Sequence, residues 1–205
     1  MKKSIYSLVA VLSIVLLFSC SEDNTKKSDV KKSIVADSIV VKEGKKIAMA
    51  SFKVLKGELM SAINQGGPIA GVDICSSKAM TITDSLSAVY KVQIKRTSAK
   101  NRNPKNSPND LEKEVLENWE KDIAQSTRIV PKVFHSDNGE VNFVAPIKMQ
   151  TLCLTCHGEK EFINPDLNTM ILEKYPDDMA HGYKEGQLRG AWSITFPKGY
   201  FDSNL

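Results

Sequence analysis

The sequence RIVPKVFHSDNGEVNFVAPIK, residues 128–148, contains a strong indication of β-structure. Its two halves, residues 128–135 and 140–148, are rich in β-branched and aromatic residues. Between them lies Asp137-Asn138-Gly139, a sequence typical of the tight turn of a β-hairpin. The stretch therefore predicts two adjacent antiparallel strands.

The rest of the chain supplies helices first and further strands later. Apolar residues recur at helical spacing over residues 48–63, and Gly66-Gly67-Pro68 ends that pattern. Further helices are predicted over residues 68–83 and 111–123, with the last one starting at Ser107 before Pro108, and further strands over 88–95 and 188–196. Helices followed by mostly antiparallel strands predict an α+β domain.

Composition limits the possible functions. The chain has 205 residues, of which 41% are hydrophobic, 25% charged and 7% aromatic, values that suit one globular domain. It has 28 basic and 24 acidic residues, and loss of Lys2 and Lys3 with an export signal would leave a net charge of +2. So small a charge excludes an electrostatic nucleic-acid binder.

The first 46 residues predict export and a membrane anchor. Residues 1–19 join Lys2 and Lys3 to an apolar run too short to span a bilayer, as in a signal peptide. Cys20 follows this run, as the cysteine of a bacterial lipobox does, and we expect it to carry lipid. The anchored protein would then lie on the periplasmic or the cell-surface side. The alternative is a plain signal peptide with an incidental cysteine. Residues 20–46, rich in Lys, Asp and Ser, predict a tether, and the folded domain is expected over 47–205.

Cys153-Leu154-Thr155-Cys156-His157 is the strongest local motif. Two thiols three positions apart on a helical turn can form thioethers with the two vinyl groups of a haem, and the next imidazole can bind the iron. The motif predicts one c-type haem per chain, an attachment that suits an exported protein. A thioredoxin-like dithiol, a zinc site and a structural disulfide are the alternatives.

The remaining cysteine, Cys75, is a candidate for the second axial ligand. It is expected on the inward face of the helix predicted over 68–83, where a thiolate could reach the iron opposite His157. The alternative is a buried, inert thiol. Other candidates for this position are His181, His135, Met149, Met170 and Met179, of which His181 is the best rival.

The motifs together resemble a known family. Ile74-Cys75-Ser76, Arg96-Thr97-Ser98, Ala145-Pro146-Ile147, Cys153 to Gly158 and Arg189-Gly190-Ala191 are similar to stretches of the small bacterial c-type haem proteins with a PAS-like fold, whose domain is also the extracytoplasmic sensor part of some histidine kinases. The resemblance implies an antiparallel PAS-like sheet with flanking helices. It also implies a single covalent haem between His157 and Cys75. Arg96 or Arg102 is expected to pair with the haem propionates; the alternative is that these arginines brace a loop by charged hydrogen bonds.

Two functions follow from these expectations. The first is a redox or diatomic-gas sensor, in which Cys75 leaves the iron on reduction and a signal passes to a protein partner. The second is an electron-transfer cytochrome on the membrane surface. A peroxidase-like enzyme ranks last, because no distal His and Arg pair is identifiable, so no catalytic residues are expected.

Overall fold

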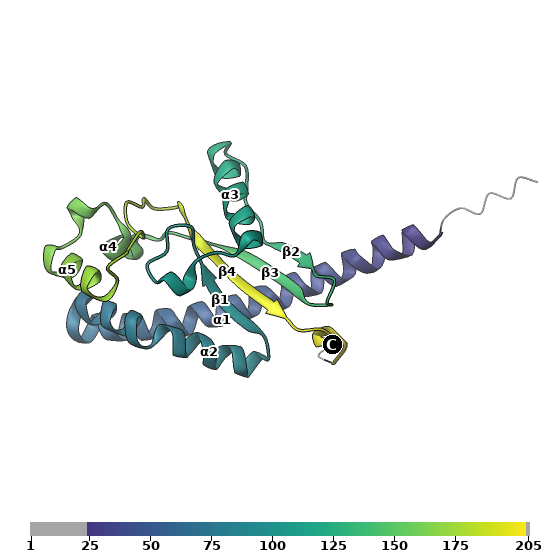
Figure 1. Cartoon of the computed structure of the whole chain (residues 1–205), viewed down its shortest axis with the longest axis horizontal. Helices are drawn as coiled ribbons and strands as arrows, with labels where there is room; N and C mark the ends of the chain where they lie inside the picture. The colour runs from purple at the N-terminus through teal and green to yellow at the C-terminus, as the bar shows by residue number, and fades with distance from the viewer. Residues whose placement is uncertain (1–23, 204–205) are drawn as a thin grey trace, which may run out of the picture.

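The hairpin predicted from residues 128–148 lies in a four-stranded antiparallel sheet of order β1-β4-β3-β2 (Figure 1). The structure, a computed structural model, describes residues 24–203, with side chains over residues 37–202. The strands are β1 (Gln93–Thr97), β2 (Lys132–His135), β3 (Val141–Lys148) and β4 (Leu188–Phe196). The helices are α1 (Asn24–Ser77), α2 (Ala79–Tyr90), α3 (Asp110–Ala124), α4 (Leu154–His157), α5 (Pro165–Lys174) and α6 (Tyr200–Ser203). The predicted α+β class is confirmed.

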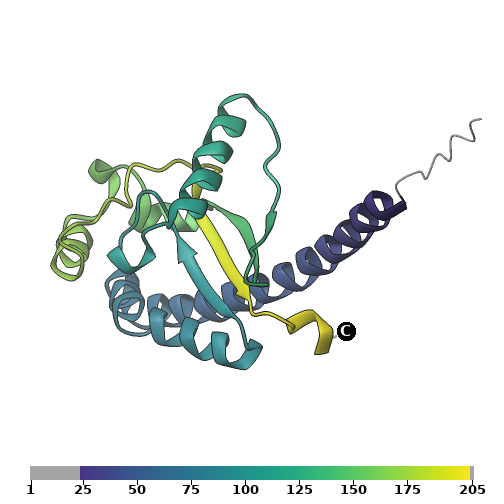
Figure 2. The same ribbon diagram turned by 45° about the vertical axis from the view of Figure 1, so that its right-hand side comes forward.

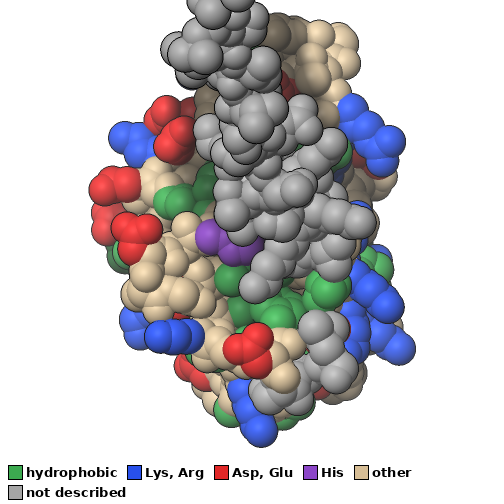
Figure 3. Space-filling view, turned by 90° about the vertical axis from the view of Figure 1, so that its right-hand side faces the viewer, with side chains coloured by type: hydrophobic (Ala, Val, Ile, Leu, Met, Phe, Trp, Pro, Cys, Tyr) green, Lys and Arg blue, Asp and Glu red, His purple; other side chains and the backbone are tan. Residues whose placement is uncertain are grey.

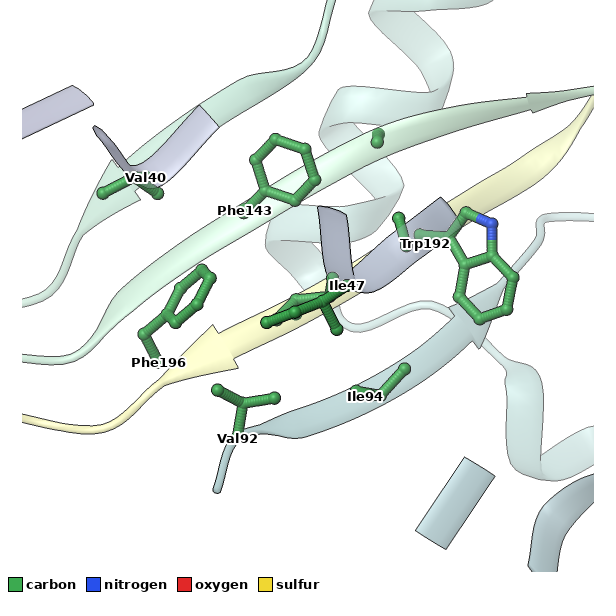
Figure 4. Close-up of a cluster of buried hydrophobic side chains, with 10 residues drawn as sticks. Val40, Ile47, Val92, Ile94, Phe143, Trp192 and Phe196 are labelled. Atoms are coloured by element: carbon green, nitrogen blue, oxygen red, sulfur yellow. The ribbon is translucent and has the colours of Figure 1, made fainter. Parts of the chain in front are cut away.

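Helix α1 covers one face of the sheet and builds the larger core with it. Val40 and Ile47 of α1 pack against Phe143 of β3 and against Trp192 and Phe196 of β4 (Figure 4). All five side chains are nearly or fully buried. The core therefore lies between α1 and the sheet.

The start of α1 corrects the predicted boundary of the domain. A tether was expected over residues 20–46, yet α1 is helical from Asn24 and Val40 is only 1% exposed. The buried stripe continues with Gly44, Ile47 and Ala48, at the spacing of one helix face. A Cβ on Gly44 would collide with the ring of Phe143, so the helix approaches the sheet through its small residues. The domain thus begins before residue 47.

The predicted break at Gly66-Gly67-Pro68 is present inside α1. Gly66 and Gly67 have non-helical backbone angles, and Gly67 has a φ of 71°. After the break the chain folds back, which brings Gly71 against the side chains of Leu59 and Ile63. Figure 1 shows the two helical segments side by side and antiparallel.

Two other boundaries differ from the prediction. The strand expected over 88–95 begins only at Gln93, because residues 88–90 form the last turn of α2, which ends at Lys91 in the left-handed conformation. Helix α3 begins at Asp110 and its N-cap is Asn109, not Ser107. The side chain of Asn109 accepts a hydrogen bond from the backbone of Glu112, and the carboxylate of Glu112 accepts one from the backbone N–H of Asn109.

Helix α3 packs on the other face of the sheet, as Figure 2 shows. Its Leu116 and Trp119 are buried against Val144 of β3 and Ala191 of β4. A third, smaller cluster joins α5 to the end of α1 through Val72, Leu167 and Ile171. The sheet is therefore covered on both faces, and α4 and α5 lie at one end of it.

The predicted signal peptide and Cys20 lie outside the described residues. Within residues 24–203, no helix is both long and apolar enough to cross a membrane. Figure 3 views the molecule from the end opposite to α4 and α5, and side chains of both charge signs are visible there, in keeping with the small net charge.

Candidate functional site

A cavity of about 260 Å³ lies at the end of the sheet near α4. It is bordered by Cys75, Arg96, Cys153, Cys156 and His157, which come from α1, β1, a 3-10 turn and α4. Most of its wall is apolar, with contributions from Leu59, Ile63, Val72, Ile82, Ile147 and Trp192. The fold thus places all the predicted site residues around one space.

The Cys-x-x-Cys-His motif forms a tight helical corner. Thr151–Cys153 is a 3-10 turn, and it continues into the single turn of α4, which ends at His157. Cys153 and Cys156 are both free thiols. The backbone N–H of Gly158 donates to the carbonyl of Leu154 and closes the turn. The two thiols and the imidazole are therefore presented on one short segment.

His157 is held in a defined tautomer. Its Nδ1 lies 2.6 Å from the carbonyl oxygen of Ala180, and because a carbonyl can only accept, Nδ1 must carry the proton. The other nitrogen, Nε2, then keeps its lone pair. Burial, followed by the positive charges of Arg102 and Arg189, lowers the pKa of His157 well below its ordinary value. At neutral pH the imidazole is therefore neutral and suited to bind a metal.

The loop after α5 supports this histidine through its backbone. The N–H of Tyr183 donates to the carbonyl of His157, and the N–H of Gly182 donates to the carbonyl of Gly158. The ring of Tyr183 stands edge-on to the imidazole, with ring centroids 6.5 Å apart. His157 is thus fixed both at its ring and at its backbone.

Cys75 approaches the cavity from the opposite element, the last turn of α1. Burial raises the pKa of its thiol, while the positive charges of Arg96 and Arg102 act in the other direction. Burial likewise raises the pKa of Cys156. In the absence of a metal, both thiols are therefore more strongly protonated than an exposed cysteine.

Arg96 and Arg102, the two expected propionate partners, have different surroundings. Arg102 is engaged by Asp178 and by two backbone carbonyls. Among the described residues, the Arg96 side chain makes no hydrogen bond or ion pair, and burial lowers its pKa. Arg96 is therefore the arginine that is available to an anionic group in the cavity.

Comparisons with known proteins agree with this arrangement. A family model described as Tll0287-like matches residues 21–197. The chain belongs to the Tll0287-like family. Among solved structures, the crystal structure of the cyanobacterial heme-protein Tll0287 is similar, with a TM-score of 0.56, 24% sequence identity, and coverage of 76% of this chain and 95% of that chain. No curated protein matches the sequence.

The match confirms the family resemblance and the PAS-like α+β fold expected from the sequence. It also extends the Tll0287-like region to residue 21, well before the predicted domain start at residue 47. Helix α1 is therefore part of the family fold.

In this Tll0287-like chain, the other candidate ligands lie in different places. Met149 is buried and borders the cavity, whereas His181, His135, Met170 and Met179 do not. Nε2 of His135 lies 2.7 Å from Asp37 at the edge of the sheet. The ring of His181 has a buried Nδ1 with no hydrogen-bond partner among the described residues. Of the six candidates, only Cys75 and Met149 share the cavity with His157.

The geometry bears on two of the three alternatives for the motif, the structural disulfide and the zinc site. Cys153 and Cys156 are not joined by a disulfide. Within the described part of the chain, no three His, Cys, Asp or Glu side chains are grouped so that they could hold a metal ion. The hypothesis of a zinc site therefore has no set of ligands among these residues.

Sequence reasoning assigned no role in the site to the residues that support His157. Asp178, Ala180 and Tyr183 lie in the segment after α5, more than 20 residues beyond the motif. A carbonyl acceptor leaves no trace in the sequence, because every residue has one. Asp178 is a carboxylate that could have been matched with Arg102, but only the fold shows that the two meet.

Proposed function

We propose that this chain binds one haem covalently through Cys153 and Cys156, with His157 as an axial ligand of the iron. The observation that carries the proposal is the shared cavity: two free thiols, an imidazole with a free Nε2 and a third thiol border one largely apolar space. Membership of the Tll0287-like family and the similarity to a heme-protein support it. The residues present therefore fit the group.

Cys75 is the proposed second axial ligand. Its thiol borders the same cavity and comes from a different element than His157. Arg96 would pair with a haem propionate, since its guanidinium has no other partner among the described residues. When bound, haem supplies an iron that changes oxidation state and can exchange a ligand.

The proposed role is sensing of redox state or of a diatomic gas, without enzymatic activity. Cys75 lies in the last turn of α1, in the short segment that follows the Gly66-Gly67 break. Release of this thiol would require a shift of that segment, which backbone hydrogen bonds at Lys78 join to α2. His157 is instead held by hydrogen bonds at both its ring and its backbone. In this proposal His157 stays bound to the iron and Cys75 is the ligand that leaves.

Electron transfer at the membrane surface is the alternative function. The observation that favours it is Leu152, which borders the cavity and is 38% exposed, so the cavity wall reaches the surface beside Cys153. An electron partner docked there would lie next to the cavity. This function needs Cys75 to remain bound in both oxidation states.

We also propose an exported, lipid-anchored location, through Cys20, with a signalling or redox protein as partner. The support is the signal-peptide pattern of residues 1–19 and the cysteine that follows it. Labelling with a fatty acid analogue in a bacterial host tests it: wild type should be labelled and Cys20→Ala should not.

The decisive experiment is spectroscopy on the protein made in a host with c-type haem maturation. Haem that resists acid-acetone extraction would support attachment at Cys153 and Cys156, and its absence would overturn the proposal. A ferric spectrum that changes in Cys75→Ala but not in Met149→Leu would support Cys75 as ligand. Carbon monoxide binding to the reduced wild type would favour sensing, and failure to bind would favour electron transfer.

A further inference from the structure

The ion pair between Arg102 and Asp178 is the most enclosed one among the described residues. Its side chains are 12% and 6% exposed, compared with 34% and 2% for Lys95 and Glu112 on the other face of the sheet. The free-energy cost of removing two charges from water is about as large as the attraction between them. A net gain in stability therefore does not explain why this ion pair is buried. Its contacts with neighbouring backbone indicate what it does.

Arg102 connects the haem motif to the loop that supports His157. Its Nε and Nη2 donate to the two carboxylate oxygens of Asp178, each at 3.1 Å. The same Nη2 donates to the carbonyl of Cys156 at 2.6 Å and lies 3.3 Å from the carbonyl of Ala180. One guanidinium therefore holds the residue before His157 and the acceptor of its ring.

Asp178 completes the arrangement from the other side. Its Oδ1 accepts a hydrogen bond from the backbone N–H of Ala180 at 2.9 Å. The amide of Ala180 is thus held by Asp178 and its carbonyl by Arg102, while that carbonyl accepts from Nδ1 of His157 at 2.6 Å. The position of this oxygen sets the plane of the imidazole.

We propose that Arg102 and Asp178 are positioning residues that fix the orientation of the His157 ring and limit the strength of its Nδ1 hydrogen bond. A hydrogen bond from Nδ1 makes a ligating imidazole a stronger electron donor. A cation that shares the acceptor oxygen opposes this effect, because it withdraws electron density from the carbonyl. The inference rests on the proposed role of His157 as an axial ligand, and neither Arg102 nor Asp178 touches the iron in it.

Three variants test the proposal in the haem-loaded protein. Arg102→Lys keeps the charge but loses the planar fork, Arg102→Gln loses both, and Asp178→Asn keeps the shape of the carboxylate but not its charge. Lys95→Gln is the matched control, since it breaks a partly buried ion pair on the opposite face of the sheet. The readout is the pattern of haem-methyl proton shifts in the ferric protein, which follows the orientation of the axial imidazole.

All three variants should change that pattern, and Lys95→Gln should not. Variants that keep haem and retain the wild-type pattern would overturn the proposal. A changed pattern in Arg102→Gln together with a wild-type pattern in Arg102→Lys would also overturn it, because a positive charge alone would then be sufficient. Wild type without covalent haem would instead overturn the proposed function. The two failures are therefore distinguishable.

Backbone hydrogen exchange in the full chain gives a readout that does not depend on haem. Because hydrogen bonds to charged partners are among the stronger ones in proteins, the amides of Ala180, Gly182 and Tyr183 should exchange at least about tenfold faster in the Arg102 and Asp178 variants. The amide of Gly186, which donates to Met149 outside this network, is the internal control. Equal exchange at all four amides in variant and wild type would overturn the proposal.

Discussion

The two sides of the cavity are built differently. On the His157 side, the ring, the backbone and the acceptor Ala180 are all hydrogen-bonded, and a buried ion pair holds them together. On the Cys75 side, the thiol lies in the last turn of a helical segment that follows a glycine break. That segment packs on α5 through apolar side chains such as Val72 and through one exposed ion pair, Asp73 with Lys174. Directional bonds fix a group in place, whereas apolar packing permits small shifts, so under the proposed function His157 is the fixed ligand and Cys75 the movable one.

Exchanging each ligand for alanine tests this contrast most strongly. We expect only a small fraction of His157→Ala chains to carry haem, because the thioethers would then have to form in a site without its fixed ligand. Cys75→Ala should keep covalent haem at wild-type level and change only the ferric spectrum. The measurement is haem content per chain, from the absorbance of the pyridine complex. Equal loss of haem in both variants would show that the two sides do not differ.

The next largest effect should come from the start of α1, which is remote from the cavity. Deleting residues 1–46 removes Val40 and Gly44 and exposes Phe143, and it should lower the free energy of unfolding by about 2–4 kcal/mol relative to deletion of residues 1–36. Chemical denaturation of both truncated proteins measures this difference. Because residues 37–46 do not border the cavity, the contrast between His157 and Cys75 should survive.

Gly44→Ala is the point variant that accompanies these truncations. In an exposed helix, alanine in place of glycine adds about 1 kcal/mol of stability. Here the new methyl would collide with Phe143 and should cost roughly 1–3 kcal/mol instead. Stabilisation by Gly44→Ala would mean that residues 37–46 behave as the tether predicted from the sequence.

The sequence predicted those parts of the molecule whose signals are local. The hairpin 128–148 and the strand 188–196 match β2, β3 and β4, because alternation and a turn sequence act within a few residues. The motif of Cys153, Cys156 and His157 is local in the same sense. These are the parts for which neighbouring residues determine the structure.

What the sequence did not reveal depends on distant partners. The buried stripe at the start of α1 uses Gly44 and Ala48, which carry little hydrophobic signal and are selected by the ring of Phe143 about 100 residues later. The alternation over 88–95 is compatible with both a strand and a helix end, and packing on α1 decides for the helix up to Tyr90. Arg102 and Asp178 are 76 residues apart and meet only in the folded chain.

Substitution of Gly67, in the break inside α1, should have a smaller effect on the Cys75 side of the cavity. Gly67 has φ 71° and ψ −173°, a region that residues with a Cβ rarely adopt, so Gly67→Ala should cost about 1–3 kcal/mol and displace the segment that carries Cys75. Gly186→Ala is the matched control, since Gly186 also has a positive φ (82°) and open space around it. Unlike Gly67, it lies in the segment after α5, on the His157 side of the cavity. Both variants should lower stability in denaturant, and only Gly67→Ala should alter the ferric spectrum in the manner of Cys75→Ala. An identical spectrum in the two variants would contradict a movable Cys75 side.

The smallest expected effect is on the pH dependence of stability in the chain without haem. Since the folded pKa of His157 is lowered, the unfolded chain takes up a proton first as the pH falls below about 6.5, and stability declines from there toward the folded pKa. The folded pKa of Cys75 is raised, so as the pH rises above about 8.5 the unfolded chain loses a proton first and stability declines again. Cys156 adds to the alkaline loss, because its pKa is also raised by burial. The measurement is the free energy of unfolding from chemical denaturation between pH 5 and 10. His157→Gln should remove only the acid decline of this free energy, and Cys75→Ala should reduce only the alkaline decline. A variant that changed both declines would show that the two sides titrate as one unit.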